Sequence, residues 1–151
     1  MMGKQIYIIA AVLVVGIGAF FWLQTPPANN SNSMTQPDLS DIDDGDPIAK
    51  VKIPSVLSAN AEIGKQIFEA ACAACHGVNA SGQKGVAPPL VHKIYEPGHH
   101  GEGAFLSAAK NGVTAHHWNF GKMPPVSGIT GGDVKMVVAY IRELQRENGI
   151  D

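Results

Sequence analysis

Residues 58–77 read SANAEIGKQIFEAACAACHG and join the start of a helix to a cysteine–histidine motif. Ser58 or Asn60 can cap the first turn, because both side chains accept hydrogen bonds from free backbone N–H groups. The apolar positions that share one face of this helix are Ile63, Ile67 and Ala71. Helical spacing therefore predicts a helix that leads directly into the motif at residues 72–76.

The motif Cys72-Ala73-Ala74-Cys75-His76 contains both cysteines of the chain. C-x-x-C-H is the signature of covalent haem attachment, in which each thiol bonds one vinyl group and the adjacent imidazole binds the iron. Three other interpretations are open. A thioredoxin-like redox pair needs a βαβ context, a structural zinc site needs four ligands, and a disulfide across two residues closes too small a loop to stabilise much. The motif favours one haem c, which would also supply the core that a small, loop-rich domain lacks.

Two further helices follow the motif. Residues 104–110 form a short helical run that Asn111-Gly112 can end. The last helix begins at a capping box, Thr130-Gly131-Gly132-Asp133, and continues to Asn148-Gly149. Its apolar positions at helical spacing are Val134, Val137, Val138, Ile141 and Leu144. The intervening loops are rich in Gly and Pro without a strand pattern, so we predict an all-α fold.

The N-terminal part predicts a membrane anchor. Residues 6–23 read IYIIAAVLVVGIGAFFWL, close to the ~20 apolar residues that a membrane span needs. We predict a signal anchor at residues 5–23; a cleaved signal peptide is the alternative, although no well-formed A-x-A-like site follows. Lys4 precedes the span and the next basic residue is Lys50, so the positive-inside rule predicts a single-pass inner-membrane protein with its C-terminal domain in the periplasm.

Residues 24–57 separate the anchor from the domain that we predict at residues 58–151. They are rich in Pro, Asn, Ser and Asp without an apolar period, which is typical of a disordered linker. Its acidic residues serve either as a solvated spacer or as a docking surface. From Ser58 onward, eight Lys or Arg residues balance eight Asp or Glu residues. Such a domain lacks the basic footprint of nucleic-acid-binding proteins.

From Ser58 to the C-terminus the chain resembles a class I cytochrome c. Residues 64–68 (GKQIF) match the first helix of that family, where Gly64 and Phe68 allow the last helix to cross closely, and Tyr140 fits the aromatic residue of that last helix. The loop Ala87-Pro88-Pro89-Leu90 resembles the family's G-P-x-L, with Ala87 at the position of the glycine. The resemblance implies that the Pro88 carbonyl accepts a hydrogen bond from His76.

The resemblance also implies a sixth iron ligand. The segment Gly121-Lys122-Met123-Pro124-Pro125 matches the family's methionine loop, so Met123 is expected to bind the iron opposite His76. His116 or His117 is the alternative ligand. Trp118 is expected in the wall of the haem pocket, where its indole N–H can bond a propionate. His99 and His100, together with His116 and His117, either have solvated or structural roles or bind a second metal such as copper, and the role of His92 is open.

With both axial positions filled, the resemblance implies an electron carrier of the respiratory chain, not an enzyme, and no small-molecule substrate. The expected partners are membrane-embedded redox complexes, namely a quinol–cytochrome c reductase-like donor and a terminal oxidase or other reductase as acceptor. One alternative is a permanent haem subunit of a larger membrane oxidoreductase. Another is a haem sensor or enzyme in which Met123 leaves the distal site open.

Overall fold

The computed structural model describes residues 34–151, and this part of the chain is helical. Its elements, in chain order, are α2 (Ala59–Ala71), α3 (Ala73–His76), the 3₁₀ turns η2 (Val78–Ala80) and η3 (Lys93–Tyr95), α4 (Glu102–Asn111) and α5 (Gly131–Glu147). Across these residues, extended pairing is limited to two isolated bridges, Gln83 with Ala87 and Val113 with Met123. The prediction of an all-α fold with long loops is confirmed.

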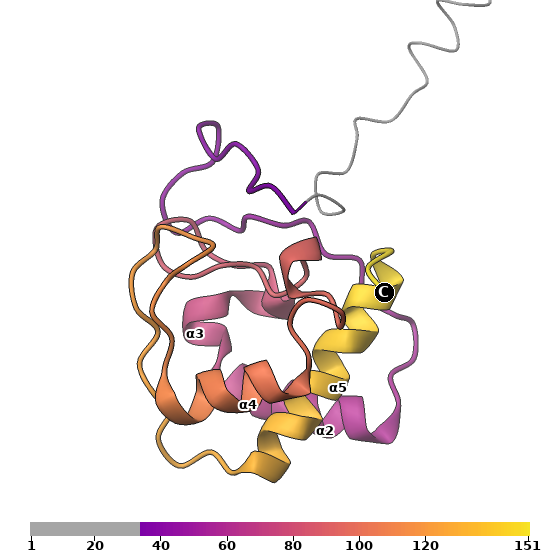
Figure 1. Cartoon of the computed structure of the whole chain (residues 1–151). Coiled ribbons are helices and arrows are strands. Elements are labelled where there is room, and N and C mark those ends of the chain that lie inside the picture. Colours follow the sequence, from indigo (N-terminus) through magenta and orange to yellow (C-terminus); the bar gives the residue numbers. More distant parts are fainter. Residues whose placement is uncertain (1–33) are drawn as a thin grey trace, which may run out of the picture.

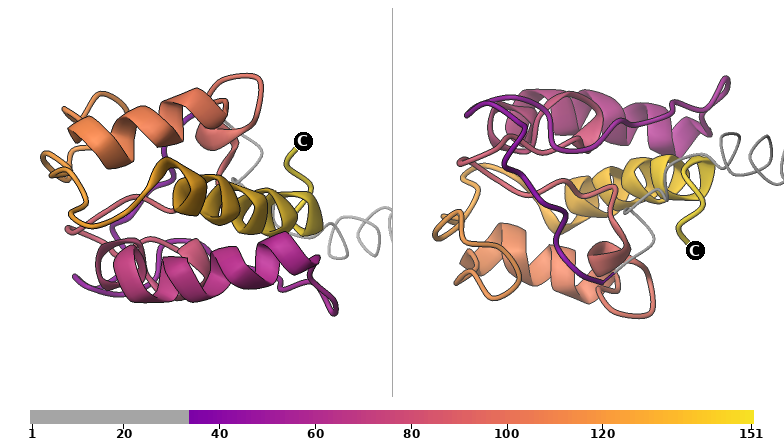
Figure 2. Two further views of the ribbon diagram at one scale, coloured as in Figure 1. Left: turned by 90° about the horizontal axis from the view of Figure 1, so that it is seen from below. Right: turned by 90° about the horizontal axis from the view of Figure 1, so that it is seen from above.

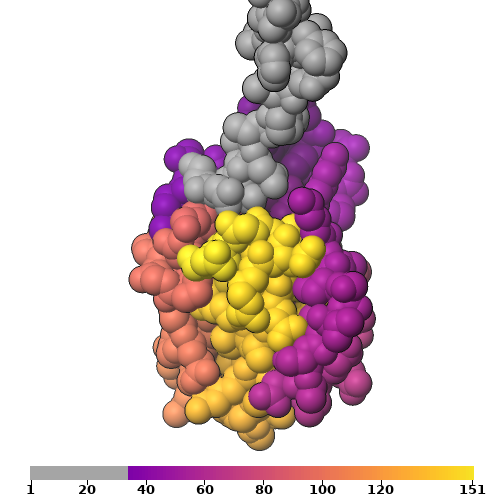
Figure 3. Space-filling view, turned by 90° about the vertical axis from the view of Figure 1, so that its right-hand side faces the viewer, coloured from indigo at the N-terminus to yellow at the C-terminus, as the bar shows by residue number. Residues whose placement is uncertain are grey.

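Helix α5 lies between α2 and α4, as both views in Figure 2 show. In Figure 1 the chain reaches α3 at one end of α2, and the loop that follows α4 lies on the same side as α3. Figure 3 shows the face on which α5 reaches the surface, with α2 on one side and the segment around α4 on the other. This arrangement encloses the space between α3 and α4 with side chains from separate parts of the chain.

The predicted features of α5 are confirmed. Thr130 is the N-cap and forms a complete capping box with Asp133. The five predicted apolar residues are all buried, as are Tyr140 and Gln145. Because the buried positions recur every three to four residues, one side of α5 contributes to both hydrophobic clusters of the described domain.

The crossing of α2 and α5 depends on Gly64. A Cβ atom at this position would lie 1.8 Å from the carbonyl oxygen of Met136, closer than any two such atoms can approach. Next to this contact, the rings of Phe68 and Tyr140 pack with their centroids 5.8 Å apart. The close approach expected from Gly64 and Phe68 is therefore present.

The buried face of α2 differs from the prediction. Its fully buried residues are Ala61, Gly64 and Phe68, whereas Ile63 is 50% exposed and Ala71 is also exposed. Ile67 lies at the edge of the core and packs partly against it. Helix α5 approaches α2 where Gly64 leaves room for its backbone, and Ile63 lies on another side of α2, turned toward solvent. The predicted N-cap is confirmed, since the Ser58 side chain accepts from the backbone N–H of Ala61.

The segment that precedes α2 is in contact with the domain. Gly45 and Asp46 exchange backbone hydrogen bonds with Lys84, and Ala49 donates to the carbonyl of Ser81. Further along, the backbone of Lys52 pairs with the Asn148 side chain at 2.9 and 2.8 Å. Residues 45–52 thus lie along the domain, where the sequence predicted a disordered linker up to residue 57.

Among residues 34–151, no helix combines the length and the apolar character that a membrane crossing requires. The anchor predicted at residues 5–23 and the first part of the predicted linker lie outside the described residues.

Candidate functional site

The two cysteines are fixed by a short break between α2 and α3. Helix α2 ends at Ala71, and the Cys72 carbonyl accepts hydrogen bonds from the N–H groups of Cys75 and His76, at 3.1 and 2.9 Å. The Gln83 side chain then donates to three carbonyls of α3, those of Ala73, Ala74 and Cys75. The C-terminal carbonyls of a helix lack intrahelical partners, so this amide satisfies groups that would otherwise face solvent. Burial and the nearby Cys75 raise the pKa of the Cys72 thiol.

His76 is buried and held in one orientation. Its Nδ1 atom lies 2.9 Å from the carbonyl oxygen of Pro88. A carbonyl can only accept, so Nδ1 carries the proton and the lone pair of Nε2 is free. Burial lowers the pKa of His76, and the bond to Pro88 opposes this in part, so the neutral imidazole is favoured. An outer contact of this kind fixes the ring of a metal ligand and raises its basicity.

The loop that contains Pro88 can approach His76 because Gly82, which lies between them, has no side chain. Gly82 donates its N–H to the His76 carbonyl at 2.7 Å, with a positive φ of 74°. A Cβ at this position would lie 2.4 Å from the backbone nitrogen of Pro89. Ala87 has a negative φ, so the alanine found where the resembling family has glycine introduces no left-handed strain.

Met123 is held by a pair of backbone hydrogen bonds. Val113 and Met123 each donate to the other's carbonyl, at 2.9 and 3.0 Å, directly after α4 ends. The loop that contains Met123 is therefore tied back to the helix that precedes it. No other methionine of the described residues lines the same cavity.

A cavity of about 680 Å³ joins these elements. All five predicted site residues line it: Cys72, Cys75, His76, Pro88 and Met123. Much of the remaining wall is apolar and comes from α4, α5 and the loop around Met123. Its volume lies within the range of cofactor and ligand sites, ~300–1,000 Å³. The structure thus brings together residues that are up to fifty positions apart in the sequence.

Two aromatic residues of the cavity wall carry polar atoms, the buried Trp118 and the half-buried Tyr95. Trp118 is 4% exposed, and among the described residues its indole N–H makes no hydrogen bond of regular geometry, although the Tyr95 hydroxyl lies nearby. Tyr95 lies close to it, and burial raises the pKa of its hydroxyl, an effect that the neighbouring indole N–H partly offsets. A buried donor without a regular hydrogen bond is costly, so the Trp118 N–H calls for an acceptor from a bound molecule.

Four histidines gather at the wall of the same cavity, from two loops. They are His99, His100, His116 and His117. His92 lies apart from them, buried under the ring edge of Trp118, and its Nδ1 accepts from the N–H of Ile94. Its position therefore supports a structural role for His92.

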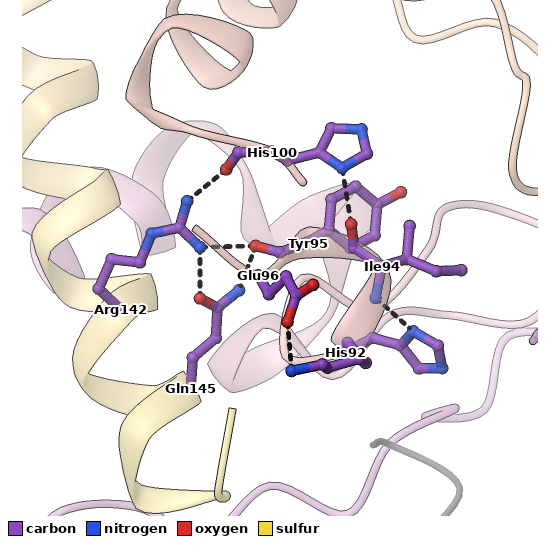
Figure 4. A network of polar contacts seen from close by, with 8 residues as sticks. His92, Ile94, Tyr95, Glu96, His100, Arg142 and Gln145 are labelled. Atoms are coloured by element: carbon purple, nitrogen blue, oxygen red, sulfur yellow. Dashed lines mark hydrogen bonds and ion pairs between the residues drawn. The ribbon is translucent and has the colours of Figure 1, made fainter. Parts of the chain in front are cut away.

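Two polar residues of α5 that the sequence analysis did not single out hold the loop around Tyr95 (Figure 4). Gln145 is fully buried and donates to the carbonyls of Leu90 and Tyr95, at 2.8 and 2.9 Å. Arg142 donates to the carbonyls of Tyr95 and His100. The sequence held one signal for these residues: both are long polar side chains next to the apolar positions of α5. A polar side chain that is buried with such positions needs hydrogen-bond partners from other parts of the chain.

The cytochrome c family model matches residues 61–145, which is more than half of the chain and includes every predicted site residue. No solved structure matches the chain. The match agrees with the helical fold and with the C-x-x-C-H motif that lines the cavity. The chain therefore belongs to the cytochrome c family, whose members are electron-transfer proteins with covalently bound haem c.

Proposed function

We propose that this protein is a monohaem electron carrier, attached to its haem through Cys72 and Cys75 and with His76 and Met123 as axial ligands. The observation that supports this most strongly is that these four side chains line a single cavity, although Met123 lies far along the chain from Cys72, Cys75 and His76. Bound haem c supplies one-electron oxidation and reduction of its iron.

The residues present fit that cofactor. The cavity is mainly apolar, as a porphyrin requires, and its volume of about 680 Å³ suits a large planar group. The Trp118 N–H makes no hydrogen bond of regular geometry within the described structure, and a propionate carboxylate is an acceptor of the right kind. The thiols of Cys72 and Cys75 lie beside the imidazole that would bind the iron.

The protein side chains would set the properties of the site. His76 keeps its proton on Nδ1, which the Pro88 carbonyl holds, so Nε2 is the ligating atom. Met123 would contribute a thioether, which raises the reduction potential relative to a second imidazole. If His76 and Met123 both bound the iron, they would leave no open position on it for a substrate, so we expect electron transfer without enzymatic activity.

We also propose that the protein is attached to the inner membrane and exchanges electrons with membrane-embedded complexes. Residues 5–23 would anchor the chain in the inner membrane with the haem domain in the periplasm, supported by the apolar run and the position of Lys4. The domain would then carry electrons between membrane-embedded complexes, from a quinol–cytochrome c reductase-like donor to a terminal oxidase or reductase. Because the domain is nearly neutral, its electron-transfer rates should depend only moderately on salt.

Replacement of the axial methionine tests the proposal. In the oxidised, haem-loaded protein, Met123→Leu should abolish the weak far-red absorption band that accompanies a methionine–iron bond. The reduced variant should bind carbon monoxide readily, whereas the wild type should not. Met136→Leu is the matched control, since this methionine lies in α5 and does not line the cavity. Rapid carbon monoxide binding by the wild type would instead favour an open-site sensor or enzyme.

Two further measurements test the covalent attachment of the haem and the mobility of the carrier. Covalent attachment requires that acidified acetone leave the pigment on the protein, and release of the pigment would contradict it. After gentle solubilisation, a mobile carrier should run as a small haem-containing particle. Stoichiometric co-purification with a large oxidoreductase would instead identify a permanent subunit.

A further inference from the structure

Two loops bring four imidazole rings together at the cavity wall. His99 and His100 end the turn that follows η3, and His116 and His117 precede the buried Trp118. The Nε2 atoms of His99 and His117 are 3.1 Å apart, and the ring centroids of His100 and His117 are 5.2 Å apart. One nitrogen from each of His99, His100 and His117 lies within 4.8 Å of the others. Side chains distant in sequence thus share one small volume.

The hydrogen bonds of these rings leave nitrogen lone pairs available. His100 Nδ1 lies 2.6 Å from the Ile94 carbonyl, a contact visible in Figure 4, so Nδ1 carries the proton and Nε2 is unprotonated in the neutral ring. His116 makes the equivalent contact, from Nδ1 to the Thr114 carbonyl at 3.1 Å. Metal-binding histidines characteristically donate their second ring nitrogen to a backbone carbonyl in this way.

The ring nitrogens of His99 and His117 that face each other leave at least one lone pair available for a metal ion. Both are Nε2 atoms, and a hydrogen bond between two neutral rings can use only one proton. A metal ion between them would interact with both lone pairs at once. Partial burial, and after it the neighbouring histidines, lowers the pKa of His100 and of His117, so the unprotonated ligand form is favoured near neutral pH.

Both loops are held by the fold. Arg142 donates to the His100 carbonyl and Gln145 to the Tyr95 carbonyl, so α5 fixes the first loop. The second loop lies between the paired backbones of Val113 and Met123, and Trp118 anchors it in the core. A site on restrained loops loses less conformational entropy when it binds a ligand.

We propose that His99, His100 and His117 form a binding site for one divalent transition-metal ion, separate from the iron site, with His116 beside it. Tetrahedral coordination at ~2.0–2.1 Å places ligand nitrogens roughly 3.3 Å apart, so the existing spacing needs only small side-chain adjustments. An all-imidazole donor set suits Zn²⁺, Cu²⁺ and Ni²⁺ over Mg²⁺ or Ca²⁺, and Cu²⁺ should bind most tightly. The bound ion would join the Tyr95 loop to the Met123 loop.

Zn²⁺ binding to the full-length, haem-loaded protein tests this site. The protein is purified in detergent without a polyhistidine tag and titrated by calorimetry at pH 7.5. Zn²⁺ is the probe because it is redox-inactive, so the measured heat does not include oxidation or reduction of the haem. We expect one ion per chain, with binding at least tenfold weaker in His99→Gln and in His117→Gln. Asn119→Gln, an exposed change in the same loop, is the control and should bind as the wild type does. An increase in Tm with Zn²⁺ should occur in the wild type and be absent from the two histidine variants.

Cu²⁺ provides an independent readout. Its electron paramagnetic resonance spectrum in the wild type should show hyperfine splitting from several nitrogens, and His117→Gln should lose part of it. The proposal is overturned if Zn²⁺ shows no saturable binding, or if both histidine variants bind as tightly as the wild type. The second result would place the ion elsewhere, for example on the acidic residues before α2.

Discussion

Gly64 has no side chain, and the contact between α2 and α5 depends on that absence. The site for its Cβ is 1.8 Å from the Met136 carbonyl oxygen, which belongs to the backbone of α5 and cannot rotate away. Any substitution must therefore separate the two helices and disturb the packing of Phe68 against Tyr140. The family resemblance expects a small residue here, and the structure gives the physical reason.

Gly64→Ala should destabilise the haem-loaded protein by about 3 kcal/mol, the upper end of the usual cost of overpacking, because the rigid backbone of α5 cannot relax locally. Urea unfolding followed by circular dichroism measures the change. Gly103→Ala in α4 is the matched control: nothing lies within 4 Å of its Cβ site, and a helical alanine in open space should stabilise by up to ~1 kcal/mol. Equal effects of the two substitutions would show that helix propensity, not the crossing, governs Gly64.

Tyr140 gives stability a dependence on alkaline pH. Its hydroxyl donates to the Asn79 side chain at 3.1 Å, and burial, together with the nearby Glu69 and Glu62, raises its pKa to about 12. An unfolded tyrosine titrates near ~10, so the native state favours the protonated hydroxyl. Its contribution is complete below pH ~10 and is lost as the pH rises toward 12.

Tyr140→Phe should cost about 1 kcal/mol at pH 7 through the lost hydrogen bond. Above pH 10, the variant should lose stability less steeply than the wild type, since it has no hydroxyl to ionise at this position. Urea unfolding at pH 7, 9, 10 and 11 measures both effects. Parallel curves for the two proteins across this range would contradict the assignment.

At the scale of elements, the start of α5 depends on a reciprocal cap. Thr130 Oγ1 accepts from the Asp133 N–H at 3.2 Å, and Asp133 Oδ2 accepts from the Thr130 N–H at 2.9 Å. The Thr130 hydroxyl also donates to Asp133 Oδ2 at 2.7 Å, and this bond, together with the one from the Thr130 N–H, lowers the pKa of Asp133. The cap therefore acts fully above the ordinary carboxyl pKa and weakens as the pH falls through the lower native value. Because α5 contacts both other long helices of the described domain, its first turn affects the whole core.

Thr130→Ala should lower the free energy of unfolding by about 1 kcal/mol, which is typical of a lost N-cap. Thr130→Ser keeps the hydroxyl and should retain most of that stability. Thermal unfolding of the three proteins at pH 7 and pH 3 tests the pair, with the Thr130→Ala effect smaller at the acidic pH. A serine variant as unstable as the alanine variant would assign the effect to the methyl group and not to the cap.

At the scale of the whole molecule, the cavity dominates stability. Its walls come from α3, α4, α5 and three loops, and its volume is about 680 Å³. At ~24 cal/mol per Å³, an enclosed void of this size would cost roughly 16 kcal/mol, as much as the entire stability of a small domain. The cofactor is thus part of the hydrophobic core.

Replacement of both thiols tests this dependence. The double variant Cys72→Ala/Cys75→Ala should lack covalent haem and lose cooperative unfolding, with greatly increased sensitivity to proteolysis. Met123→Leu keeps the covalent bonds and should remain folded, so it separates loss of the cofactor from loss of one ligand. A cooperative transition in the thiol-free protein, in the absence of haem, would contradict the view that the cofactor completes the core.

Local patterns in the sequence determined the helical character of this protein, the two ends of α5 and the buried side of that helix, because capping and periodicity act within a few residues. They also determined the attachment motif, whose three residues have fixed offsets. Periodicity did not determine the buried side of α2, because two sets of residues have helical spacing: Ile63, Ile67 and Ala71, and Ala61, Gly64 and Phe68. Hydrophobicity favours burial of the set with the isoleucines, but the tertiary structure buries the set with Gly64. Close backbone approach reverses that preference. Contacts between distant parts of the chain, which no local pattern encodes, likewise decide three other features. They are the docking of residues 45–52, the hydrogen bonds that Arg142 and Gln145 donate to the loop around Tyr95, and the meeting of His99, His100 and His117.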